Sequence, residues 1–202
     1  MEAGSKTGYE QAVERIQHAI DTRASDLDIS GLGLTELPEL ITRAKYLVEV
    51  NCSENYGLTD LSPLSGLTSL QQLDCSYTSV SDLSPLSGLT SLQALDCSDI
   101  PVSDLSPLSG LIALQELVCI GTQVSDLSPL SEFKSLHELD CSDTPVSDLS
   151  PLSKVTSLQT LNCSFTSVSN LSPLSGLTAL KELDCSDTPI SDLSPLSGLR
   201  HL

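Results

Sequence analysis

The sequence predicts an α/β repeat protein, in which short units stack into a right-handed solenoid and their parallel strands form one sheet on the concave side. Three observations predict this fold class. Segments of 22 residues recur almost verbatim from Leu61 to the end of the chain. Each full segment contains apolar residues in alternation, as in a strand with one buried face. Most segments also contain Ser-Pro followed three residues later by Gly, which leaves room only for a turn or a short 3₁₀ helix.

The segment before the repeats is expected to form a capping helix over about residues 8–23. Thr7 and Glu10 have the spacing of a capping box, which marks a helix start. The apolar stripe expected to face the first unit consists of Tyr9, Val13, Ile16 and Ile20. A solenoid needs such a cover over its open edge. We therefore assign residues 1–25 to an N-terminal capping helix and residues 26–202 to the solenoid.

The solenoid is expected to hold about eight units. Two looser copies around Leu27 and Leu47 precede six near-perfect 22-residue copies that begin at Leu61, and the last copy is truncated at Leu202. Leu202 aligns with the residue that begins a strand in the other copies, and no capping segment follows it. We expect this edge to be uncapped because the chain was cut from a longer protein; cover by another chain is the alternative.

Within one copy, Leu73 and Cys75 are the predicted buried residues of the strand. Ser84 is the predicted N-cap of the following 3₁₀ turn, and Pro85 its first residue. A second acidic row, represented by Asp82, precedes each Ser-Pro and is expected to cap the turn.

These residues resemble a known family. The pattern Leu-x-x-Leu-x-Cys-x-x-Thr-x-Val, followed by Ser-Asp-Leu-Ser-Pro-Leu-Ser-Gly-Leu, resembles the 22-residue leucine-rich repeat of internalin-type bacterial proteins, over roughly Leu27 to Leu202. The resemblance implies a leucine-rich-repeat solenoid, or horseshoe, with 3₁₀ turns on its convex side and a role in binding other proteins. Two departures stand out. Cys replaces the third aliphatic of the strand, and Thr replaces the family's buried Asn, which only Asn55 keeps. We expect a Thr ladder that Ile100 interrupts.

The opening repeat, from Leu27 to Pro38, also resembles that of Roco-type proteins, which carry a GTPase domain after their repeats. The 202 residues contain no P-loop, so we do not expect this chain to be the GTPase.

The charge excludes several partners. Nine Lys and Arg residues against 27 Asp and Glu residues give a net charge of −18, and the linear sequence shows no local basic patch. A strong negative field opposes contact with phosphate backbones and anionic membranes, so we expect neither nucleic acid nor membrane as a partner. The sequence also has no apolar run of about 18 residues and no signal-peptide pattern at its start.

The seven cysteines are expected to be packing residues. Six of them recur at one offset, 22 residues apart, whereas zinc sites need close pairs. A disulfide between in-register neighbours would strain the strands. We therefore expect no metal, no cofactor and a cytoplasmic, reducing location, with export by a route without a cleaved signal peptide as the alternative. No His lies near a nucleophile and a carboxylate in the repeat pattern, so we do not expect an enzyme.

The candidate binding site is the concave face of the sheet. Strand residues between the buried Leu and Cys must point outward, and most of them are acidic, except in the middle copy, where Val118 and Ile120 replace Asp and Ser. An apolar centre with a charged rim is typical of protein interfaces. The candidate partner-binding residues are Tyr77, Asp74, Asp96, Glu116, Val118, Ile120, Glu138, Asp140, Phe165 and Asp184. The alternative interpretation is that duplication copied a turn-forming Asp and that one copy drifted.

The sequence thus predicts a non-enzymatic protein–protein interaction module that uses its acidic concave face to bind another protein, and the negative charge of that face favours a basic one. Two alternatives remain at this point. One is a structural solenoid that self-associates through the uncapped C-terminal edge. The other is the N-terminal regulatory part of a larger protein, such as a Roco-type GTPase or a bacterial effector.

Overall fold

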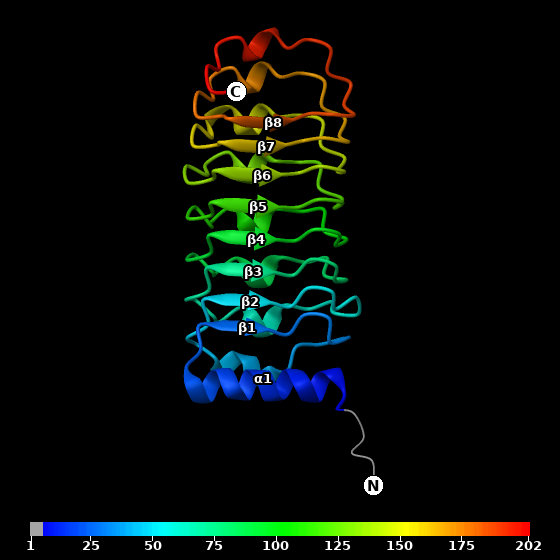
Figure 1. The fold of residues 1–202 in the computed structure, drawn as a ribbon, viewed down its shortest axis with the longest axis vertical. Helices are drawn as coiled ribbons and strands as arrows, with labels where there is room; N and C mark the ends of the chain where they lie inside the picture. The colour runs from blue at the N-terminus through cyan, green and yellow to red at the C-terminus, as the bar shows by residue number, and fades with distance from the viewer. Residues whose placement is uncertain (1–5) are drawn as a thin grey trace.

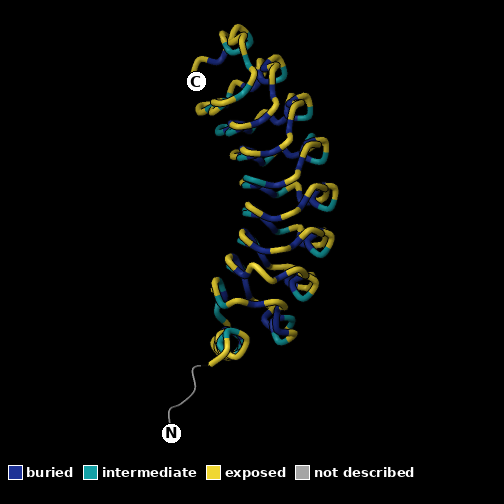
Figure 2. Tube along the Cα trace, turned by 90° about the vertical axis from the view of Figure 1, so that its right-hand side faces the viewer, coloured by how far each residue is buried: buried dark blue, intermediate teal, exposed yellow. Residues whose placement is uncertain are grey.

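The computed structural model describes residues 6–202 and confirms the predicted solenoid (Figure 1). One helix, α1 (Gly8–Thr22), precedes a single parallel sheet whose eight strands pair in chain order. The strands are β1 (Asp26–Asp28), β2 (Glu49–Asn51), β3 (Gln72–Asp74), β4 (Ala94–Asp96), β5 (Glu116–Val118), β6 (Glu138–Asp140), β7 (Thr160–Asn162) and β8 (Glu182–Asp184). Figure 2 shows that the stack curves, with the strands along the inner side of the arc. Over the described residues, no helix is both long and apolar enough to cross a bilayer.

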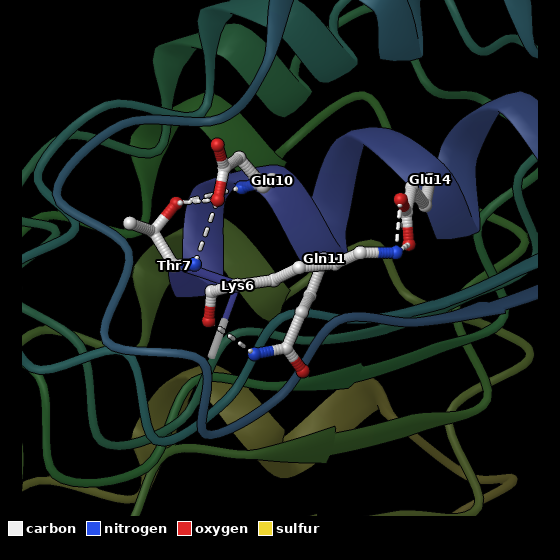
Figure 3. A network of polar contacts seen from close by, with 5 residues as sticks. All are labelled: Lys6, Thr7, Glu10, Gln11 and Glu14. Carbon is white, nitrogen blue, oxygen red and sulfur yellow. Dashed lines mark hydrogen bonds and ion pairs between the residues drawn. The ribbon is translucent and has the colours of Figure 1, made fainter. Parts of the chain in front are cut away.

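The predicted capping box begins α1 (Figure 3). The Thr7 hydroxyl accepts a hydrogen bond from the Glu10 backbone N–H at 3.2 Å, and the Glu10 carboxylate accepts one from the Thr7 backbone N–H at 2.9 Å. These bonds satisfy two backbone donors that a helix start leaves free. Lys6, just before the helix, forms an ion pair with Glu14 in the second turn. The helix ends at Thr22 and is capped by Arg23, which adopts a left-handed conformation.

The buried stripe of α1 differs from the predicted one. Ala12, Ile16 and Ala19 are buried against the first unit, whereas Tyr9 is 43% exposed. The small side chains of the two alanines let the helix approach β1 closely, and a stripe led by Tyr9 would hold it further away. Of the four residues of the predicted stripe, only Ile16 is therefore fully buried; Val13 and Ile20 are half-buried.

Each unit continues from its strand through a turn into a short 3₁₀ helix, as predicted. These helices are η1 (Glu39–Arg43), η2 (Ser62–Leu64), η3 (Ser84–Leu86), η4 (Ser106–Leu108), η5 (Ser128–Leu130), η6 (Ser150–Lys154), η7 (Ser172–Leu174) and η8 (Ser194–Leu196). The predicted capping role of Ser84 is wrong, because Ser84 is the first residue of η3 and Pro85 the second. Asp82 performs the capping: its Oδ1 accepts the Ser84 backbone N–H at 2.8 Å. The prediction that the acidic row caps these turns is thus confirmed.

The cysteines line the core behind the sheet. All seven are free thiols, and all but Cys185 are buried. Five of the six buried thiols donate to a backbone carbonyl of the next unit; for example, Cys75 Sγ donates to the Asp96 carbonyl at 3.4 Å. Burial raises the pKa of Cys52, Cys119 and Cys163 to about 12. The thiols are therefore protonated and unreactive at neutral pH.

Thiol chemistry should follow this burial. Under native conditions at neutral pH, a thiol-reactive dye should modify about one cysteine per chain, Cys185, and modify all seven once the protein is unfolded. Mass spectrometry of the labelled peptides identifies the reactive residue. Rapid native labelling of Cys97 or Cys119 would contradict the buried column.

The ladder beside the cysteines is weaker at Thr than at Asn. Thr78 and Thr122 donate only to the carbonyl three residues earlier in their own unit, both at 2.8 Å. Asn55 is fully buried and also bonds to Ile29 and Leu34 of the preceding unit. The Thr side chains therefore close their own turns without joining neighbouring units. Ile100, which interrupts the ladder, is buried as an apolar residue.

The two ends of the sheet differ. α1 covers the outer side of β1, and the Arg15 guanidinium donates to the Asp28 carbonyl at 2.8 Å. At the other end, Leu183 and Cys185 are only partly buried and Leu193 is 61% exposed. The unit that carries β8 therefore presents apolar side chains that the same positions bury in earlier units.

Candidate functional site

The outward strand residues form two columns on the concave face, because each strand is paired in register with the next. The first column contains Asp26, Glu49, Gln72, Ala94, Glu116, Glu138, Thr160 and Glu182. The second contains Asp28, Asn51, Asp74, Asp96, Val118, Asp140, Asn162 and Asp184. Stacking therefore brings residues that are 22 positions apart to neighbouring places, and carboxylates dominate both columns.

The Asp residues of the second column also shape the backbone. Asp74 Oδ1 accepts hydrogen bonds from the Ser76 backbone N–H at 3.0 Å and from its hydroxyl at 2.6 Å. Asp96 and Asp140 make the same turn with the serines two residues later. The copied-turn interpretation is thus correct for one oxygen of each of these carboxylates. In Asp74 and Asp96 the other oxygen has no hydrogen bond among the described residues, so negative charge remains on the face.

The middle copy lacks this turn. Val118 and Ile120 replace Asp and Ser together, so the carboxylate acceptor and the hydroxyl donor are both absent. Both side chains are half-buried. Val118 lies on β5, in register with Asp96 on β4 at one side and with Asp140 on β6 at the other. An apolar step with a carboxylate on each side therefore interrupts the acidic column. Two coordinated replacements at adjacent outward positions form one surface feature.

The residue after each of these serines lies at the rim of the sheet in a left-handed conformation. Tyr77 and Phe165 have φ values of 54° and 55°, with 46% and 61% of their surface exposed. In the middle copy this residue is Gly121, with φ at 66°. A Cβ there would come within 2.6 Å of Asp99 Oδ1, so the glycine gives the Asp99 carboxylate room beside Ile120. A hydrogen bond to Asp99, together with its charge, raises the pKa of Tyr77.

Like charges meet directly at the centre of the face. Glu116 on β5 pairs in register with Glu138 on β6, as Asp74 on β3 does with Asp96 on β4. Burial raises the pKa of Glu138, and repulsion from Glu116, Asp140 and Glu182 raises it further. Side-by-side carboxylates destabilise a sheet, so this arrangement has a folding cost that a positive partner would relieve.

The concave face is hollowed beside the apolar step. Asp74, Asp96 and Glu116 line a hollow of about 220 Å³ with Ala94, whose short side chain opens it between Gln72 and Glu116. Of the other predicted residues, Glu138 and Asp140 lie next to Glu116 and Val118. Asp184 and Phe165 lie further along the sheet, and Tyr77 lies at its rim. The predicted set is therefore one central group with three outlying members.

A second, larger hollow was not predicted from the sequence. It measures about 500 Å³ between α1 and β1, and its polar lining residues are Glu14, Arg15, His18, Asp26 and Asp28. No local pattern marks it, because it forms where a helix packs on a strand edge. Within residues 6–202, no three His, Cys, Asp or Glu side chains are grouped so that they could hold a metal ion.

The pH dependence of stability should follow the Asp-Ser turns. Hydrogen bonds from serine lower the pKa values of Asp82, Asp104, Asp126 and Asp148. A carboxyl with a lowered folded-state pKa contributes stability above its unfolded pKa of about 3.9 and loses it as the pH falls through the folded value. Replacing these four residues with Asn keeps the acceptor, as Asn170 shows in its own copy.

The four-Asn variant should therefore lose less thermal stability than the wild-type protein between pH 5 and pH 3, measured by circular dichroism. Equal losses in the two proteins would show that these turns do not contribute to the acid response.

Three segments match the family model for leucine-rich repeats in two copies: residues 68–110, 112–154 and 156–198. The search of curated proteins finds no match. Among solved structures, the fold is similar to internalin C2 from Listeria monocytogenes, with a TM-score of 0.87 and 30% sequence identity over 96% of this chain and 90% of that chain.

Two further Listeria monocytogenes structures are similar. Internalin F matches with a TM-score of 0.87 and 26% identity over 100% of this chain and 65% of that one. The functional domain of InlJ, which includes a cysteine ladder, matches with a TM-score of 0.73 and 26% identity over 84% of this chain and 36% of that one. This chain therefore spans less than two thirds of both of these structures.

Proposed function

Because the chain belongs to the internalin-type leucine-rich-repeat proteins, whose solenoids mediate protein–protein interactions, we propose that it binds a basic protein partner through its acidic concave face. The proposed contact is centred on Val118 and Ile120. The fold is in general an interaction scaffold rather than an enzyme. The observation that carries the proposal is the apolar step between Asp96 and Asp140 in an otherwise polar column.

The energetics support a contact at this step. Burying a Val or Ile side chain fully contributes roughly 1.5–3 kcal/mol, and interface energy is concentrated in a few central residues. Asp96, Glu116 and Asp140 around the step favour positive charge, and the repulsion felt by Glu138 would fall when a cation binds. The partner expected to fit therefore places an apolar side chain on Val118 and Ile120 and basic side chains around them.

The test restores the consensus of the chain's own repeats. V118D/I120S recreates the Asp-Ser turn that Asp96 and Ser98 form, so the variant should fold normally. Partner capture from a lysate of the source organism should fall about tenfold or more, because the apolar contact is lost even though the added Asp attracts a basic partner. The matched control is I112T, which removes an Ile that is 62% exposed outside the concave face and also restores the consensus.

Equal capture by V118D/I120S and the wild-type protein would refute the concave centre. An equal loss in I112T would show that the effect is not specific to this face.

A second candidate function is self-association through the C-terminal edge. The specific observation is an apolar group in which Leu193 is exposed and the others are only partly buried: Leu183, Cys185, Ile190 and Leu196. α1 covers the N-terminal edge, so copies would join at their C-terminal edges as closed dimers rather than as filaments. Light scattering should show a dimer that L193S weakens; a strict monomer at high concentration would exclude this function.

We also propose that the protein resides in a reducing compartment, as its seven free thiols favour. Fractionation of the source cells, with thiol counting on the isolated protein, tests this. Recovery from an oxidising compartment with the thiols intact would overturn it.

A further inference from the structure

The few basic residues of the repeats lie on one flank of the solenoid. After residue 50 the chain has only four Lys or Arg residues: Lys134, Lys154, Lys181 and Arg200. Each base comes after the start of the 3₁₀ helix of its unit and before the position at which a strand begins in the repeat. The four units are consecutive. The segments that lead from the 3₁₀ helices back to the strands lie on the side of the sheet opposite the loops that leave the strands (Figure 1), and Lys154 is the last residue of η6, where such a segment begins. We call these four residues the basic flank; the linear sequence separates them by 19 to 27 positions and hides their proximity.

The stacking places neighbouring members of the basic flank within reach of each other. In an earlier unit, Lys45 Nζ donates to the Gly66 carbonyl at 2.9 Å. Lys134 and Lys154 occupy these same two positions four units later. One unit further, Lys181 Nζ donates to Gln159 Oε1 at 2.7 Å, again across a unit boundary. The flank therefore has one base in each of four consecutive units, at three different positions of the repeat.

Among the described residues no ion pair joins a carboxylate to this row, although the exposed Glu132 occupies in its unit the position that Lys154 holds in the next. Within the described residues the only ion pair is Lys6–Glu14, although acids outnumber bases threefold in the chain. All four side chains of the basic flank are exposed. Adjacent unpaired cations repel each other, and an anionic surface placed across them removes that repulsion.

The opposite flank offers a complementary row. Asp82, Asp104, Asp126 and Asp148 supply one exposed carboxylate in each of four consecutive units, before the Ser-Pro turns. Because both rows follow the same 22-residue unit, they have the same rise along the solenoid. A base row on one molecule can therefore meet an acid row on another at every unit.

We propose that the basic flank of one copy docks laterally on this acidic row of a second copy, so that solenoids lie side by side. The contact is heterologous, since different surfaces of the two molecules meet, and it leaves the concave face and the C-terminal edge free. It is independent of the proposed function. Surface ion pairs are individually weak, so the association is weak and depends on several pairs acting together.

The salt dependence follows from the charge distribution. At about 0.01 M salt the screening length is about 30 Å, and the net charge of −18 on each copy keeps the molecules apart. At about 0.15 M it is about 8 Å, so the repulsion between distant acids is screened while contacts between the two rows persist. At about 1 M salt the screening length is about 3 Å, so the contacts between the two rows are screened as well. Association therefore passes through a maximum near physiological salt.

Two neutralising variants test the contact by sedimentation. K134Q/K154Q/K181Q neutralises three of the four residues of the basic flank, and D82N/D104N/D126N/D148N neutralises the acidic row while Asn keeps the turn, as Asn170 does. Each variant alone should have an association constant about tenfold lower than the wild-type protein. Mixed in equal amounts they should associate again, because one supplies an intact acidic row and the other an intact basic flank. All proteins in this comparison also carry L193S, which weakens contacts through the C-terminal edge, so that the association measured is the lateral one.

The proposal is overturned if the mixture associates no better than the separate variants, or if the wild-type protein stays monomeric from 0.01 to 1 M salt. Retention of the wild-type monomer on immobilised polyphosphate, lost in K134Q/K154Q/K181Q, would assign the flank to an anionic polymer instead and equally overturn it. A failure of this test would leave V118D/I120S capture unaffected.

Discussion

Replacing Asn55 with Ala is expected to lower the free energy of unfolding by about 3 kcal/mol. The fully buried Asn55 side chain makes four hydrogen bonds: it accepts from the Leu34 backbone N–H at 2.9 Å and donates to the carbonyls of Ile29, Cys52 and Ser53. Ala would leave these backbone groups buried without partners, and each unsatisfied group costs roughly 1–3 kcal/mol. Denaturant unfolding followed by circular dichroism measures the difference.

The matched control is T78A in the next unit. Thr78 makes a single side-chain hydrogen bond, to the Cys75 carbonyl at 2.8 Å, so its loss should cost about 1 kcal/mol. Hydrogen exchange adds a spatial test, because a repeat protein transmits damage mainly to nearest neighbours. N55A should expose amides around β1 and β2 and leave β6 and β7 protected. Equal destabilisation by N55A and T78A would contradict the assigned role.

Neutralising Asp96 and Asp140 is expected to have the largest effect on partner binding. The two carboxylates lie in register on either side of Val118. D96N/D140N keeps the turn, since Asn51 and Asn162 accept from Ser53 and Ser164 in the same way. Stability should therefore change little, whereas affinity for a basic partner should fall about tenfold to a hundredfold through two lost interface charges. Surface plasmon resonance with the captured partner measures the dissociation constant.

The salt series of that experiment separates charge from shape. Wild-type affinity should decline with added salt, and the variant should show a shallower decline because it forms fewer ion pairs. D60N is the control: it neutralises an exposed Asp on the other side of the unit, where Asp60 caps Ser62. An unchanged affinity in D96N/D140N, or the same loss in D60N, would contradict a charged concave contact.

The fold was predictable because the same 22-residue pattern recurs through most of the chain. A strict 22-residue period fixes which residues stack, and the alternation of Leu73 and Cys75 fixes which face is buried. The capping box at Thr7 was predictable because it depends only on the spacing between Thr7 and Glu10. The stripe of α1 was not, because the choice of Ala12 and Ala19 over Tyr9 depends on how closely the helix approaches β1.

The site was only partly predictable. The register places Val118 between Asp96 and Asp140, as the period implies, but the left-handed conformation at Tyr77 could not be inferred, since aromatic residues disfavour it. The sequence also could not decide whether each Asp of the concave face forms a turn, because an Asp at that position is equally consistent with a solvated charge. The basic flank depends on positions in different units, and so it appears only after stacking.

Footprinting of the captured complex by carbene labelling and mass spectrometry tests the central claim most directly. Labelling should drop on binding at Val118, Ile120 and the neighbouring residues of β4, β5 and β6, and stay unchanged at Ile112 and in the Ser-Pro turns of the convex side. Protection confined to Ile112 or to the convex turns, with Val118 and Ile120 labelled as in the free protein, would contradict recognition through the concave face.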